Sequence, residues 1–227
     1  MNEQLSHQHL DTEAGAAVYS PLVLKLYDWW VLGISNRLAW QCSTKTVLGP
    51  FYKAYMGRRH LDVGVGTGFY PAHANLSRSQ EIALLDLNKN SLHAAAARLG
   101  QRDVRLLIQD VMRPLSLSPD VQYDSISLFY LLHCLPGTLE SKEPAIANLK
   151  RHLAKDGVLY GATILGDAAG HNGFGRLLMK TYNRKGIFGN KSDTIDRLQG
   201  MLQKQFKQVE VRQHGKVALF TARKPLS

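Results

Sequence analysis

The sequence predicts an α/β protein built on a doubly wound, largely parallel sheet. Strand-like apolar runs alternate with stretches of helical periodicity through the middle of the chain, as in parallel sheets with right-handed crossovers. The first run leads into a glycine-rich turn, and three successive runs reach the acidic residues Asp62, Asp86 and Asp110. Because ligands of open α/β sheets bind beyond the carboxyl ends of the strands, these features also predict a ligand site.

Composition narrows the class of protein. The 227 residues, 44% apolar and 20% charged, suit one soluble globular domain. Cys42 and Cys134 lie far apart and form neither a disulfide pattern nor a metal-ligand spacing, so we expect no metal and a cytoplasmic location. The polar N-terminus is unlike a signal peptide, and no apolar run approaches the ~20 residues of a membrane helix. The oligomeric state stays open.

Residues 1–56 are expected to form a loose tail and a helical cap. Apolar residues recur at helical spacing from Leu22 to about Trp40, and a second helix is expected at about 43–56. All three tryptophans lie in the first of these segments. Its aromatic residues either pack on the core or form a lid over a ligand, and Tyr27 and Trp30 are candidate substrate contacts.

Residues 57–165 are expected to form the ligand-binding core. Helices are expected at about 70–75, at 90–99 with Gly100 as its C-cap, and at 143–154, before a turn at 155–157. The strands are expected before the glycine turn and at 81–86, 104–110, 123–132 and 158–165.

Residues 166–227 are expected to complete a single domain, 1–227. A glycine-rich insertion at 166–190 contains a short helix at 174–182. A further helix, capped by Asp193 or Thr194, runs to about Phe206. Two alternating strands, 208–213 and 216–222, then form a hairpin about the turn at His214-Gly215.

The glycine-rich turn has the pattern D-x-G-x-G-x-G, from Asp62 to Gly68. Its backbone N–H groups make a site for the polar part of a nucleotide-like ligand. Phe69 occupies the position where a dinucleotide fingerprint of the form G-x-G-x-x-G needs its third glycine, and the Gly-Lys-Ser/Thr of a P-loop does not follow. An acid within the turn favours a ligand with a cationic group, because it would repel phosphates.

The acids that follow the strands suit the remaining parts of such a ligand. Asp86 lies about 20 residues beyond the turn, where an acid accepts hydrogen bonds from ribose hydroxyls. Asp110, one strand further out, suits an exocyclic purine amine, and Asp62 suits an ammonium or sulfonium group.

This pattern resembles the class I S-adenosylmethionine-dependent methyltransferases from about Arg58 to Leu165. The resemblance implies a Rossmann-like seven-stranded sheet of order 3-2-1-4-5-7-6 with its last strand antiparallel. It implies that the glycine turn holds the methionine part of the cofactor S-adenosylmethionine. The cofactor-binding residues that it implies are Asp62, Gly64, Gly66, Thr67, Gly68, Asp86, Leu87, Asp110, Val111 and Phe129.

The acceptor side is less strongly specified. His133 follows the fourth strand, where it would face the methyl group, and is the candidate catalytic base if the acceptor is a hydroxyl or a protonated amine. Tyr130 and His171 join Tyr27 and Trp30 as candidate substrate contacts. For His133 and His171 a packing or loop role is the competing interpretation. Aromatic side chains here would also stabilise a sulfonium.

Three functions are compatible with the sequence. The first is methylation of a small, aromatic or heterocyclic molecule. The net charge of +10 raises RNA methylation as an alternative, although the basic residues are scattered and the Asn/Asp-Pro-Pro-aromatic motif of base-amine methylases is missing. A third alternative is a catalytically silent subunit that binds the cofactor and activates a partner.

Overall fold

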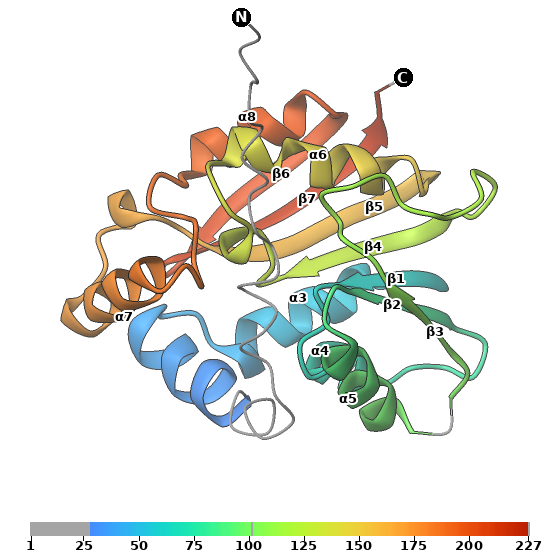
Figure 1. The fold of residues 1–227 in the computed structure, drawn as a ribbon, viewed down its shortest axis with the longest axis horizontal. Coiled ribbons are helices and arrows are strands. Elements are labelled where there is room, and N and C mark those ends of the chain that lie inside the picture. Colours follow the sequence, from blue (N-terminus) through green and yellow to red (C-terminus); the bar gives the residue numbers. More distant parts are fainter. Residues whose placement is uncertain (1–27, 101, 227) are drawn as a thin grey trace, which may run out of the picture.

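A single seven-stranded sheet runs through the molecule in the order β3-β2-β1-β4-β5-β7-β6 (Figure 1). The computed structural model describes residues 28–100 and 102–226. The first five strands pair in parallel, and β7 is antiparallel to both β5 and β6. The strands are β1 (Arg59–Val63), β2 (Glu81–Asp86), β3 (Val104–Ile108), β4 (Tyr123–Phe129), β5 (Leu153–Ile164), β6 (Phe206–His214) and β7 (Val217–Pro225). The predicted strand order is confirmed.

Helices cover both faces of the sheet, with α6 and α8 on one face and α3, α4 and α5 on the other (Figure 1). The chain begins its described part in the π-helical segments η1 and η2, and α7 packs against η1. The helical elements are η1 (Asp28–Ala39), η2 (Thr44–Leu48), α3 (Gly49–Tyr55), α4 (Phe69–Ala72), α5 (Lys89–Leu99), η3 (Leu132–Cys134), α6 (Leu139–Lys150), η4 (Asp167–Ala169), α7 (Gly173–Arg184) and α8 (Ile195–Gln203).

The alternation of side chains along β1 shows how the two faces differ. Leu61 and Val63 point into the large apolar core under α6 and α8. His60 and Asp62 point to the opposite face and are also buried. Burial of apolar area stabilises a fold by roughly 25 cal/mol per Å², and both faces bury apolar side chains. The buried polar side chains on the second face need internal partners as well.

Several expected boundaries were wrong, for local physical reasons. The fourth strand stops at Phe129 because Tyr130 has φ +60°, which turns the chain into η3. Helix α6 begins before Glu143, at Leu139, and accommodates Pro144 internally. The third strand ends at Ile108, two residues before Asp110.

Two further boundaries differ near the end of the chain. The expected turn at 155–157 lies inside β5, where the register shifts from Tyr123 opposite Leu153 to Ser125 opposite Val158, so the strand absorbs three extra residues. The helix expected to reach Phe206 ends at Gln203, because Phe206 starts β6 and is buried. Within residues 28–100 and 102–226, no helix combines the length and apolar character needed to cross a bilayer.

Candidate active site

The glycine turn connects β1 to α4 and adopts backbone angles that other residues rarely adopt. Gly64, Gly66 and Gly68 have φ of 72°, 53° and 69°. A Cβ atom at Gly64 would lie 2.8 Å from Leu131 Cδ1, and one at Gly68 would lie 2.7 Å from the backbone of Ala95 in α5. Glycine is therefore required at these two positions both by conformation and by the closeness of neighbouring elements.

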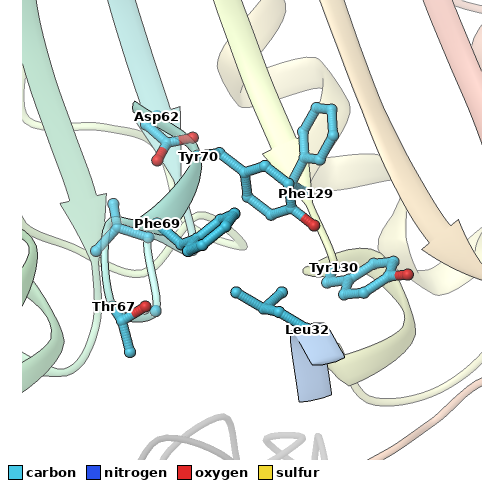
Figure 2. Close-up of a pocket in the computed structure, with 10 residues that line it drawn as sticks. Leu32, Asp62, Thr67, Phe69, Tyr70, Phe129 and Tyr130 are labelled. Carbon is cyan, nitrogen blue, oxygen red and sulfur yellow. The ribbon is translucent and has the colours of Figure 1, made fainter. Parts of the chain in front are cut away.

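A pocket lies directly beyond this turn, at the carboxyl ends of β1 and β4. In Figure 2 the side chains of Phe69, Tyr70, Tyr130 and Leu32 surround one space, and Asp62 lies above Phe69 at the upper left of the view. Several of the predicted cofactor residues lie in its wall, which combines aromatic rings with the polar side chains of Asp62 and Thr67. The lining residues are Leu32, Asp62, Gly64, Val65, Gly66, Thr67, Phe69, Tyr70, Phe129 and Tyr130.

Asp62 is a buried acid at the edge of this pocket, with 4% of its surface exposed. Its carboxylate accepts hydrogen bonds from the hydroxyl groups of Ser127 and Tyr52. Burial raises the pKa of Asp62 to about 7, and these two donors oppose the rise. A cationic group placed in the pocket would favour the ionised carboxylate.

Asp86 ends β2 beside the glycine turn. Its carboxylate accepts the backbone N–H of Asn88 at 2.9 Å, and the backbone N–H groups of Val65, Gly66 and Leu87 also act on it. Burial raises the pKa of Asp86 to about 6, while these N–H groups lower it. The structure thus brings the predicted ribose acid against the predicted glycine turn, and Leu87 is half-buried next to it.

Asp110 and Val111 follow β3 in a turn further along the sheet edge. Asp110 accepts the backbone N–H of Met112 at 2.9 Å and lies 3.8 Å from the Arg113 guanidinium. Val111 is buried in the main core, and its carbonyl accepts a 3.0 Å hydrogen bond from Asn148. Neither is among the residues that line the pocket, so their roles at the adenine stay a prediction.

An aromatic cluster continues from the pocket toward α7. The Tyr130 ring centroid lies 5.4 Å from that of His133, which in turn lies 4.6 Å from Phe188. Tyr130 is buried at a positive φ, a conformation that costs free energy and tends to occur at functional sites. Phe188 was not a predicted site residue, since it lies 58 residues beyond Tyr130 and only folding brings both rings against His133.

His133 is buried and held in one tautomer. Its Nδ1 lies 3.2 Å from the backbone N–H of Ile164, which can only donate, so Nδ1 accepts and Nε2 carries the proton of the neutral ring. Burial and the Lys142 charge lower the pKa of His133 to about 3. A neutral ring with its proton on Nε2 favours hydrogen-bond donation over action as a base, and catalysis by His133 stays a prediction.

Of the other predicted substrate residues, His171 has a described side chain, whereas those of Tyr27 and Trp30 are not described. His171 is buried against Trp40, at 5.6 Å between ring centroids, and its Nε2 lies 3.0 Å from the carbonyl oxygens of both Leu165 and Gly166. It therefore holds the chain after β5 and is not among the residues that line the pocket, so its contact with a substrate stays a prediction. Tyr27 is outside the described residues, and Trp30 is described only by its backbone within η1.

Comparisons with known proteins agree with this geometry. A family model described as a methyltransferase domain matches residues 61–159. The chain is 42% identical to the physcion biosynthesis cluster O-methyltransferase of Aspergillus chevalieri, over 94% of this chain and 96% of that one. It is 43% identical to methyltransferase verB of Penicillium polonicum, over 92% and 98%. A solved complex of DhpI with S-adenosylhomocysteine (SAH) has the same fold, with a TM-score of 0.67, 16% identity and coverage of 96% and 98%.

Proposed function

We propose that this chain, which belongs to the class I S-adenosylmethionine-dependent methyltransferases, methylates a hydroxyl oxygen of a small aromatic or heterocyclic molecule. The family membership rests on relatives 42–43% identical over nearly the whole chain. The choice of an oxygen atom draws on relatives that are O-methyltransferases by name. The single structural observation behind the acceptor class is the set of aromatic rings that line the pocket beside the glycine turn, namely Phe69, Tyr70, Phe129 and Tyr130.

The cofactor is S-adenosylmethionine, and the residues at the turn fit it. Gly64 and Gly66 line the pocket, so at these positions no side chain stands between a ligand and the backbone. Asp62 supplies a buried carboxylate for the amino group, and Asp86 supplies acceptors for the ribose hydroxyls. When bound, S-adenosylmethionine supplies an activated methyl group and becomes SAH.

The chain's own contribution to the reaction is orientation and exclusion of water. Aromatic side chains line the space beside the glycine turn, and aromatic walls with a few polar groups are typical of small-molecule sites. Alignment of the reacting atoms can supply much of the rate enhancement of such a transfer. In this proposal His133 donates a hydrogen bond from Nε2 toward the acceptor region and keeps its ring neutral.

The named relatives favour a small-molecule methyltransferase over the two alternative functions. Named relatives support small-molecule methylation over RNA methylation, which only the charge of +10 favoured. They likewise support an active methyltransferase over a silent subunit.

The test is turnover of a panel of small phenols, anilines and thiophenols with S-adenosylmethionine, followed by mass spectrometry of the product. We expect methylation of phenols, and turnover confined to anilines or thiophenols would refute the oxygen assignment. His133→Ala should slow turnover while leaving SAH affinity unchanged. The matched control is His152→Ala, since His152 is also buried but bonds Val121, which precedes β4; equal activity of both variants would give His133 a packing role.

A further inference from the structure

A buried chain of hydrogen bonds lies on the sheet face behind the pocket, and the methyl-transfer chemistry does not use it directly. Parallel pairing of β1 with β4 sets His60 opposite Ser125 and Asp62 opposite Ser127. Because side chains alternate along a strand, these four residues share one face of the sheet. Tyr52 of α3 closes the group from above, and all five side chains are at least 96% buried.

The centre of the chain is the His60 ring. Its Nδ1 lies 2.7 Å from Ser125 Oγ, while its Nε2 lies 2.9 Å from the Tyr52 hydroxyl and 3.1 Å from Ser127 Oγ. Both polar atoms of the ring therefore have partners, and the ring packs edge-on against Tyr52 with centroids 5.6 Å apart.

The direction of each hydrogen bond follows from the two ends. Ser127 donates its hydroxyl proton to Asp62, so its oxygen is left to accept from His60, which places the ring proton on Nε2. Nδ1 of the neutral ring must then accept from the Ser125 hydroxyl. The Ser125 oxygen in turn accepts the backbone N–H of Gly57 at 2.7 Å. Each group in the series therefore donates to the next. The Ser125 hydroxyl donates to the His60 ring, the ring donates to Ser127, and Ser127 donates to the Asp62 carboxylate.

We infer that His60 is a positioning residue that aims the Ser127 and Tyr52 hydroxyls at Asp62 and thereby holds this carboxylate ionised for the cofactor's amino group. The inference rests on the proposed contact between Asp62 and that amino group. Without the Nε2–H donor, the Ser127 and Tyr52 oxygens lose a hydrogen bond that polarises their hydroxyl groups, and each hydroxyl becomes a weaker donor to the buried carboxylate.

The titratable side chains that surround Asp62 are uncharged near neutral pH, apart from Asp86. Burial lowers the pKa of His60 to about 3, so its ring does not compete for a second proton near neutrality. Burial also raises the pKa values of Tyr52 and Tyr160, which face Asp62 from α3 and β5 and stay uncharged. Asp86 also acts on Asp62, and its negative charge raises the pKa of Asp62.

The experiment is calorimetric titration with SAH between pH 5.5 and 8.5, which requires no acceptor. For the wild-type protein we expect affinity to fall about tenfold between pH 8 and pH 6, because the ligand-free Asp62 has a pKa of about 7 and protonation removes the partner of the amino group. For His60→Leu we expect the loss of SAH affinity to begin about one pH unit higher than in the wild type. At high pH the two proteins should bind SAH with the same affinity.

Three variants separate positioning from a general structural role. His60→Gln keeps a donor near the Nε2 position and should restore the wild-type pH profile. Ser127→Ala removes one donor and should shift the profile in the same direction as His60→Leu, which keeps the test decisive if His60→Leu does not fold. His152→Leu removes another buried ring, which bonds Val121 ahead of β4, and should leave the profile unchanged.

Two results would overturn the inference. A loss of SAH affinity of equal size at every pH in His60→Leu or Ser127→Ala would indicate simple damage to the pocket. An unchanged profile in both variants would show that Asp62 does not depend on the chain. Asp86 is present in all of these proteins, so its titration cancels from the comparison. Failure of every phenol to react would refute only the proposed acceptor, whereas absence of SAH binding by the wild type would refute the cofactor site itself.

Discussion

Gly68→Ala tests the fit between the glycine turn and α5. Gly68 has φ +69° and ψ 22°, a left-handed conformation that costs an alanine about 1–2 kcal/mol. Its new Cβ would also lie 2.7 Å from both Cα and Cβ of Ala95, which is fully buried in α5 and cannot rotate away. Overpacking of this kind costs about 1–3 kcal/mol. We expect the free energy of unfolding to fall by a total of about 2–5 kcal/mol.

Gly170→Ala is the matched control for this substitution. Gly170 has nearly the same backbone conformation, φ 68° and ψ 55°, but among residues 28–100 and 102–226 no heavy atom beyond its own chain neighbours lies within 4 Å of the position that an alanine Cβ would take there. It should therefore lose only about 1–2 kcal/mol. Urea unfolding followed by circular dichroism measures both, and SAH titration should weaken for Gly68→Ala alone. Equal losses in the two variants, with SAH affinity intact in both, would refute the argument that α5 restricts the turn.

The remaining predictions concern one acid of the site and one buried ion pair. Asp86→Ala should weaken SAH binding by about 1–3 kcal/mol, because hydrogen bonds to the ribose hydroxyls are lost; an unchanged calorimetric affinity would disprove the ribose assignment. Lys142→Met should lower the free energy of unfolding by about 3–5 kcal/mol, since Lys142 is fully buried 2.8 Å from Asp193, which would be left without its counter-charge. Lys204→Met breaks an exposed pair with Glu143 and should cost at most about 1 kcal/mol in the same urea assay; similar costs would contradict the burial argument.

Local patterns in the sequence were sufficient for the sheet and the cofactor edge. The alternation of apolar runs with helical stretches predicted the parallel strands, and the seven-stranded order came from the family resemblance. The spacing of Gly64, Gly66 and Gly68 predicted a turn with positive φ, which all three adopt. Such features are readable because each depends on a few consecutive residues and their backbone preferences.

The predicted ends of strands and helices were wrong where the local sequence pattern did not show where an element starts or stops. The apolar run from Tyr123 to Leu132 reads as one strand, yet Tyr130 turns out of the extended conformation at φ +60°. The helix expected to start at Glu143 begins four residues earlier, at Leu139, and includes Pro144. In both places tertiary packing outweighed local propensity.

By itself the sequence determined the fold, the cofactor and the residues of the glycine turn, because these follow from short-range spacing and resemblance. Only the tertiary structure decided the environment of the polar side chains. It buried His60 between Tyr52, Ser125 and Ser127, and it fixed the proton of His133 on Nε2 through the N–H of Ile164. The physical reason is that the charge and tautomer of a group depend on burial and on hydrogen-bond partners, and those partners come from strands and helices distant in the sequence.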